Sequence, residues 1–154
     1  MTINNKNKII EYFESGIKKK ELIGVENEKF LFFKDIGKRA DYPIVQKLLE
    51  TFSKEYDWKK INENSNLIGL KLDGKSISLE PGNQLELAGD KLNNIHEVCS
   101  ESYNFQDQLT KICNKLNLES MSVGYDPITK LNEAPNNPKE RYKIMTKEMP
   151  KNGK

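Results

Sequence analysis

Residues 77–87, with the sequence ISLEPGNQLEL, alternate apolar and polar side chains on both sides of a Pro-Gly step. Successive side chains of a strand point to opposite faces of a sheet. One face is therefore predicted to bury the aliphatic side chains of Ile77, Leu79, Leu85 and Leu87. The other is predicted to display the polar side chains of Ser78, Glu80, Gln84 and Glu86. This pattern favours a two-faced sheet with oxygen ligands along one face.

A second acidic strand is predicted within residues 21–33. Glu26 and Glu28 share the even face, and the apolar odd positions are Ile23, Val25, Leu31 and Phe33. Glutamate is a poor strand former, so glutamates at four strand positions favour a functional explanation. Carboxylate oxygens are the ligands that Mg²⁺ prefers, commonly with substrate phosphates, and they also suit Mn²⁺. We expect the sheet to hold divalent cations; a plain solvated sheet surface is the alternative. The predicted metal ligands are Glu26, Glu28, Glu80 and Glu86.

The spacing of these carboxylates leaves two arrangements open. In a straight strand that rises ~3.3 Å per residue, Glu80 and Glu86 would lie ~20 Å apart, too far to share one ion. Either the Pro-Gly step bends the chain, or the two residues serve different ions or substrates. Glu26 and Glu28, about 7 Å apart along the backbone, can bind one ion or two adjacent ions.

Periodicity elsewhere predicts helices and a hairpin in a single unit, residues 1–154. Apolar side chains recur at helical spacing within residues 9–17, 43–52, 95–116 and 139–149. The dipeptide Asp73-Gly74 favours a two-residue hairpin turn, the run 62–66 is typical of a polar loop, and 121–123 favours a short strand. The fold class predicted is α+β, an antiparallel sheet with helices on one face.

One motif in the chain resembles a phosphate-binding loop. Residues 69–76, GLKLDGKS, fit the pattern GxxxxGK[ST]. That loop works only when it opens a helix whose N-terminal amides surround the phosphate. Here ISLEP follows, which alternates like a strand and then meets a proline. We interpret the segment as a hairpin.

Composition excludes several other classes of function. The net charge of +2 on 154 residues gives no reason to expect a nucleic acid or an acidic membrane as partner. His96 is the only histidine, so a zinc site is not predicted. Cys99 and Cys113 would lie ~21 Å apart on one helix, too far for a disulfide. We expect both to be small buried thiols in a cytoplasmic protein, since the first residues contain no apolar targeting segment.

Four segments make the chain similar to the plant-type glutamate–cysteine ligases, a family shared with many proteobacteria. The segment GVENEKF (24–30) resembles the family's GTEHEKF, and SLEPGNQLELAG (78–89) resembles SLEPGGQFELSG. The segment IHEVCSE (95–101) is similar to LHQTCAE, and RYKIM (141–145) with MPK (149–151) matches GRYxIM…MPK. The resemblance covers most of residues 6–154. Because the family's enzymes are much longer, we expect an N-terminal portion that does not turn over alone.

The resemblance implies a glutamine-synthetase-like catalytic fold and an ATP-dependent ligase. ATP would phosphorylate the γ-carboxylate of glutamate, and the amine of cysteine would then displace the phosphate, the first step of glutathione biosynthesis. The four glutamates would hold Mg²⁺ or Mn²⁺, Gln84 would orient a substrate or ligand, and Arg141 would pair with a carboxylate or phosphate. The partners implied are the small-molecule substrates glutamate, cysteine and ATP.

Several positions depart from the family's pattern, but none of them removes a carboxylate. They are Asn27 for histidine, Asn83 for glycine, Ala88 for serine and Glu140 for glycine. Asparagine accepts left-handed backbone angles better than most residues, so Asn83 is tolerable. Two alternatives stay open: a non-catalytic remnant that keeps the fold, and a related carboxylate–amine ligase with another amine acceptor.

Overall fold

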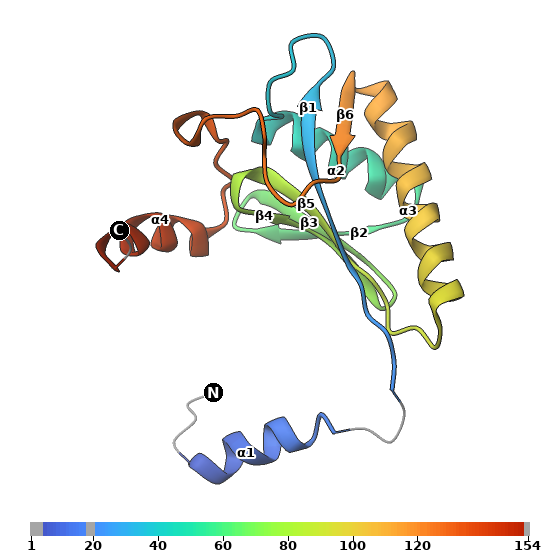
Figure 1. Ribbon diagram of the computed structural model, residues 1–154, viewed down its shortest axis with the longest axis vertical. Helices are drawn as coiled ribbons and strands as arrows, with labels where there is room; N and C mark the ends of the chain where they lie inside the picture. Colours follow the sequence, from blue (N-terminus) through green and yellow to red (C-terminus); the bar gives the residue numbers. More distant parts are fainter. Residues whose placement is uncertain (1–4, 18–20, 153–154) are drawn as a thin grey trace.

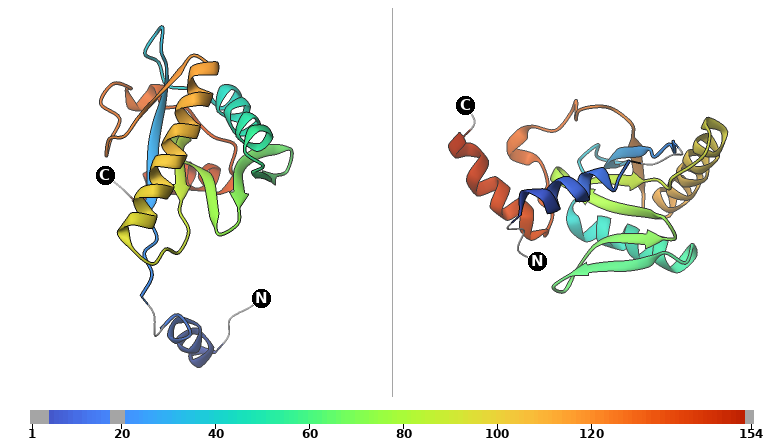
Figure 2. Two further views of the ribbon diagram at one scale, coloured as in Figure 1. Left: turned by 90° about the vertical axis from the view of Figure 1, so that its right-hand side faces the viewer. Right: turned by 90° about the horizontal axis from the view of Figure 1, so that it is seen from below.

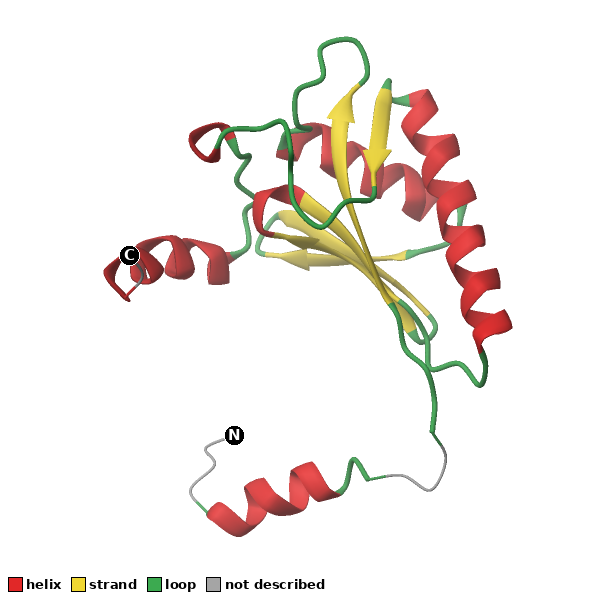
Figure 3. Cartoon of the chain, viewed as in Figure 1, coloured by secondary structure: helices red, strands yellow, loops and turns green. Residues whose placement is uncertain are grey.

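The computed structural model describes residues 5–17 and 21–152, and its centre is one antiparallel sheet (Figures 1 and 3). The strands lie in the order β2-β3-β4-β5-β1-β6, and every neighbouring pair is antiparallel. The α+β prediction is therefore confirmed for the described residues. The strands are β1 (Glu26–Phe33), β2 (Lys59–Glu63), β3 (Asn66–Leu72), β4 (Lys75–Glu80), β5 (Gln84–Ala88) and β6 (Leu118–Met121).

Two of the helices form a layer against one face of this sheet, as Figure 2 shows from two sides. These are α2 (Tyr42–Glu55) and α3 (Ile95–Lys115), whereas α1 (Lys6–Glu14) buries no residue and α4 (Glu140–Asn152) lies beside the sheet. The prediction of helices on one face thus holds for α2 and α3. Two short 3₁₀ turns complete the order, η1 (Pro81–Asn83) and η2 (Leu131–Glu133).

The core lies between the sheet and these two helices. Helix α2 begins where the Asp41 side chain accepts a hydrogen bond from the Ile44 amide, with Pro43 in its first turn. Its Phe52 ring stacks on Phe105 of α3, with centroids 6.1 Å apart. Five of the aliphatic side chains predicted to face inward are confirmed in this core: Leu31, Ile77, Leu79, Leu85 and Leu87. The prediction is wrong for Ile23, which precedes β1 and is 40% exposed, and Val25 is only partly buried.

Three local predictions are wrong. The supposed loop 62–66 contains the ends of β2 and β3, joined by a tight turn in which Asn64 has a positive φ of 54°. Its polar residues misled the prediction because β2 is an edge strand and has no buried residue. The strand expected at 121–123 is β6, three residues earlier. Ile95 is the first of the apolar side chains at helical spacing in 95–116, which predicts that it lies on the buried stripe of α3, but it is 58% exposed because it lies in the first turn.

The hairpin interpretation of residues 69–76 is confirmed. Strands β3 and β4 pair antiparallel, with Leu72 opposite Lys75, and Asp73 in the turn has a φ of 51°. The segment leads into β4 rather than a helix, so its amides bond across the sheet instead of surrounding a phosphate.

Replacing Lys75 with alanine is therefore expected to change nucleotide affinity by no more than about 0.5 kcal/mol, the usual range for a surface substitution. Lys75 Nζ lies 3.9 Å from a Glu101 carboxylate oxygen on α3, which gives the side chain a structural partner. Titration calorimetry with ATP on both proteins measures the difference. Loss of nucleotide binding in Lys75→Ala alone would contradict the hairpin interpretation.

The two cysteines have different environments. Cys113 is buried in the core, and burial raises the pKa of its thiol to about 12. Cys99 is exposed on α3, so the prediction of a buried thiol is wrong for this residue. Both are free, as expected. None of the helices in the described residues has the length and apolar character needed to cross a membrane.

Candidate functional site

The Pro-Gly step reverses the chain, which decides between the two arrangements that the spacing left open. Residues 81–83 form the turn η1, and β4 and β5 run back alongside each other with Glu80 opposite Gln84. Glu86 lies opposite Ser78, two pairs further along and on the same face. The straight-strand separation of ~20 Å therefore does not occur. Glu80 and Glu86 instead lie close together on two adjacent strands.

Strand β1 adds the other two glutamates to the same sheet face. Glu28 lies opposite Glu86 across the β1–β5 pair, and Glu26 lies opposite Ala88. With Ser78 on β4, this makes a row of three polar residues across three adjacent strands. The helices α2 and α3 cover the opposite face, with the aliphatic side chains of these strands between. We call the polar side the acidic face, made of Glu26, Glu28, Ser78, Glu80, Gln84 and Glu86.

The carboxylates of the acidic face influence one another. Partial burial raises the pKa of Glu86 above its ordinary value, and the charges of Glu80, Glu26 and Glu28 raise it further. Ser78 Oγ donates weakly toward both sides, 3.2 Å from Glu80 and 3.5 Å from Glu86. Negative charges held this close repel one another, and a divalent cation would relieve that repulsion.

The donor set suits a divalent ion, although its side chains are directed elsewhere in this structure. Within residues 5–17 and 21–152, no three acidic, histidine or cysteine side chains converge closely enough to form a metal site. Glu28 accepts a hydrogen bond from Gln84 Nε2, and Glu80 points toward α4. The carboxylate oxygens are hard ligands of the kind that Mg²⁺ and Mn²⁺ take. The metal-site assignment stays a prediction that this donor chemistry supports.

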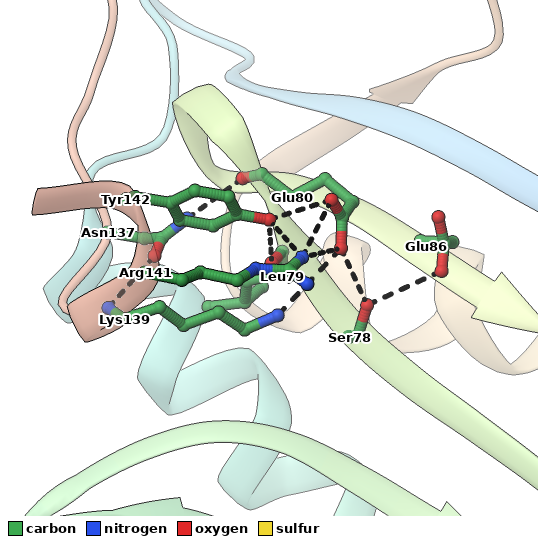
Figure 4. A network of polar contacts seen from close by, with 8 residues as sticks. All are labelled: Ser78, Leu79, Glu80, Glu86, Asn137, Lys139, Arg141 and Tyr142. Atoms are coloured by element: carbon green, nitrogen blue, oxygen red, sulfur yellow. Dashed lines mark hydrogen bonds and ion pairs between the residues drawn. The ribbon is translucent and has the colours of Figure 1, made fainter. Parts of the chain in front are cut away.

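Glu80 is the centre of a polar network that joins the acidic face to α4 (Figure 4). Arg141 Nη2 lies 2.8 and 3.0 Å from the two Glu80 carboxylate oxygens. The Tyr142 hydroxyl donates to the same carboxylate at 2.7 Å, and Lys139 Nζ lies 3.8 Å from it. The Asn137 amide donates to the Glu80 backbone carbonyl at 2.9 Å. Arg141 thus has a carboxylate partner within the chain, and its side chain remains 57% exposed for a further one.

Sequence reasoning missed Lys139 and Tyr142. Lys139 is 8% exposed, and burial lowers the pKa of its ammonium group. Burial and the hydrogen bond to Glu80 raise the pKa of Tyr142 to about 12. Tyr142 sits beside Arg141 in the RYKIM segment, so the motif carried a signal for it. Nothing in the sequence near Lys139 indicated a buried cation, because most lysines are exposed.

The family model described as Glutamate-cysteine ligase family 2 (GCS2) matches residues 22–154, which include every residue of the acidic face. The chain belongs to this family. The resemblance inferred from four short segments is thereby confirmed.

Curated plant relatives of this family member match it along nearly its whole length. A chloroplastic glutamate–cysteine ligase of Medicago truncatula is 37% identical over 150 residues, 96% of this chain and 30% of that protein. Glutamate–cysteine ligase A of Oryza sativa subsp. japonica, also chloroplastic, is 38% identical with the same coverage. The chloroplastic enzyme of Arabidopsis thaliana is 35% identical over 147 residues, 94% of this chain and 28% of that enzyme. The chain spans about 30% of the length of these relatives.

Glu86→Gln in this ligase-family chain is expected to stabilise the folded protein at pH 7. The raised pKa of Glu86 means that ionising it costs the folded state more than the unfolded state, so stability falls as pH rises above the ordinary glutamate range. Removing the charge opposite Glu28 should add about 0.5 kcal/mol, the size of a cross-strand charge pair. The gain should vanish below about pH 4, where the carboxyl is protonated in both states.

Urea unfolding of both proteins at pH 7 and pH 4 measures this difference. The matched control is Glu119→Gln, which removes an exposed strand carboxylate on β6. Equal stabilisation by both substitutions, or a gain for Glu86→Gln that persists at pH 4, would show that repulsion among the carboxylates of the acidic face does not lower the free energy of unfolding.

Proposed function

We propose that this chain supplies the metal–ATP face of an ATP-dependent glutamate–cysteine ligase. In that reaction ATP phosphorylates the γ-carboxylate of glutamate, and the cysteine amine then displaces phosphate to form the γ-glutamyl amide bond. The observation that carries the proposal is the gathering of four glutamates and Gln84 on the sheet face opposite α2 and α3, beside Arg141. Membership of the ligase family supports it. Because the chain spans about 30% of its relatives, the complete reaction is proposed for the ligase as a whole.

The residues of the acidic face fit the group that the reaction needs. Glu26, Glu28, Glu80 and Glu86 would hold Mg²⁺ or Mn²⁺, which neutralises phosphate charge when bound with ATP. Gln84 offers both a donor and an acceptor to orient a ligand or substrate. Arg141 has a planar fork that suits a carboxylate or phosphate, and Tyr142 and Lys139 keep Glu80 in place beside it.

Three finer assignments belong to the same proposal. The sheet would be part of a glutamine-synthetase-like catalytic fold, which the antiparallel order with helices on one face supports. The reaction would be the first step of glutathione biosynthesis. The protein would act in the cytoplasm, an assignment supported by its two free thiols, whereas the relatives compared are named chloroplastic.

Isotope transfer tests the reaction. The complete ligase that contains this chain is purified and incubated with MgATP, cysteine and glutamate labelled with ¹⁸O in the γ-carboxylate, and products are analysed by mass spectrometry. We expect γ-glutamylcysteine together with ¹⁸O in the released phosphate, since acyl-phosphate formation moves a carboxylate oxygen to phosphorus. Glu119→Gln should match the wild type, and Glu28→Gln/Glu86→Gln should not react.

The two alternatives predict different outcomes in the same assay. A related ligase with another acceptor would transfer ¹⁸O to phosphate only when a different amine from an acceptor panel replaces cysteine. A non-catalytic protein would transfer none with any amine in any assembly that contains this chain, and that result would overturn the proposal.

A further inference from the structure

The turn between Glu80 and Gln84 depends on backbone conformations that need support. Gly82 and Asn83 are consecutive residues with positive φ, 69° and 54°. A left-handed conformation is costly for a residue with a side chain and persists only when its surroundings enforce it. Asn83 is also 1% exposed, and its amide nitrogen and oxygen make no hydrogen bond. Glycine adopts this conformation freely, and asparagine does so better than most residues. The part of the turn that needs support from outside is therefore the buried Asn83, whose side chain has no hydrogen-bond partner.

Arg39 makes the contact that reaches this turn. Its Nη2 donates to the Gly82 carbonyl, which is the centre of η1. Asn137 holds the preceding carbonyl, that of Glu80, at 2.9 Å. Arg39 makes no hydrogen bond or ion pair with any side chain of the acidic face, so it acts on them only through the backbone of the turn.

The guanidinium of Arg39 is held at both of its Nη atoms, whereas its buried Nε has no hydrogen-bond partner. Its side chain is 4% exposed, Nη1 lies 2.6 Å from Asp126 Oδ2, and its Cζ lies 4.6 Å from the centre of the Phe30 ring. The other Asp126 oxygen accepts the backbone amides of Ile128 and Thr129, each at 2.9 Å. Asp126 thus anchors the arginine to the loop that follows β6, and the arginine anchors the turn.

We propose that Arg39 is a positioning residue for the acidic face: clamped by Asp126 and stacked on Phe30, it fixes the Gly82 turn that sets Glu80 beside Gln84 and Glu86. The role needs a fork with two separated donors, one for Asp126 and one for Gly82. Lysine keeps the charge but presents one ammonium group, which cannot hold both partners in this geometry. The inference rests on the proposed metal-binding function of this face for its effect on ligands, and on the turn alone for its effect on structure.

The test compares Arg39→Lys, Asp126→Asn, their double variant and the neighbouring exposed Lys38→Gln as control. Mn²⁺ affinity is measured by titration calorimetry with ATP present, and the amides of residues 82–84 are followed by NMR hydrogen exchange. We expect Arg39→Lys to lose about tenfold in Mn²⁺ affinity, as is typical of outer-shell partners of metal ligands. Exchange at 82–84 should accelerate while exchange in the β4–β5 core stays slow. Lys38→Gln should match the wild type.

The double variant should bind Mn²⁺ no more weakly than Arg39→Lys does, because Asp126 acts through the arginine. Additive losses would overturn the proposal, as would unchanged exchange at 82–84 in Arg39→Lys. If a variant exchanges rapidly throughout, Arg39 is a general structural residue and the proposal fails. If the wild type binds no Mn²⁺, the proposed metal function fails, and exchange at 82–84 still decides whether Arg39 holds the turn.

Discussion

Replacing Glu28 and Glu86 together with glutamine is expected to weaken Mn²⁺ binding, measured with ATP present, about 100-fold, or ~2.8 kcal/mol. These residues lie directly opposite each other on β1 and β5, at the centre of the acidic face. A pair of unit charges 4 Å apart interacts by ~1 kcal/mol in water and ~4 kcal/mol near a protein surface, so two lost carboxylates account for this loss. Glutamine keeps the size and one oxygen of each side chain, which separates the loss of charge from the loss of shape.

Titration calorimetry with MnCl₂ and ATP on wild type and variant measures the change. The control is Glu11→Gln/Glu14→Gln on α1, which removes two exposed carboxylates and alters the net charge equally. If both double variants bind Mn²⁺ as the wild type does, the four glutamates are a solvated sheet surface. If both lose affinity equally, the attraction is a diffuse effect of net charge.

Glu80→Ala is expected to lower the free energy of unfolding by about 2 kcal/mol and to release α4 from the sheet. Hydrogen bonds to charged groups contribute roughly 1.5–3 kcal/mol each, and Glu80 holds both Arg141 and Tyr142. Its loss also leaves the buried Lys139 ammonium without its nearest carboxylate. The stabilising effect of Glu80 is thus opposite in sign to that expected for Glu86.

Urea unfolding gives the change in stability, and limited proteolysis followed by mass spectrometry reports on α4. Cleavage within residues 143–151 should become faster in Glu80→Ala than in the wild type. The control is Glu119→Ala, which removes a glutamate from the edge strand β6, whereas Glu80 lies on β4. It should change neither measurement. Unchanged stability and cleavage in Glu80→Ala would show that the Glu80 network does not hold α4.

The strand faces could be predicted from the sequence because the alternation of side chains is a property of the local backbone. Leu79 and Glu80 must point to opposite sides of any strand that contains them, and both do. The turn at Asp73-Gly74 and the start of α2 at Asp41 are similarly local, since the residues that form them are within a few positions of one another. Strand β2 was missed and β6 was misplaced because an exposed edge strand and a four-residue strand carry little pattern.

What the sequence alone determined is therefore the chemistry of each element: which residues are acidic, which face they share, and which family they resemble. The tertiary structure decided which of these residues lie next to each other. It placed β5 beside β1, so that Glu86 meets Glu28, and it brought Arg141 and Tyr142 to Glu80 from about sixty positions away. It also put Arg39 on the Gly82 carbonyl. The face to which a strand side chain points follows from the geometry of a few residues. The long-range contacts depend instead on which distant surfaces bury one another, and that is decided by the free-energy balance of the whole chain.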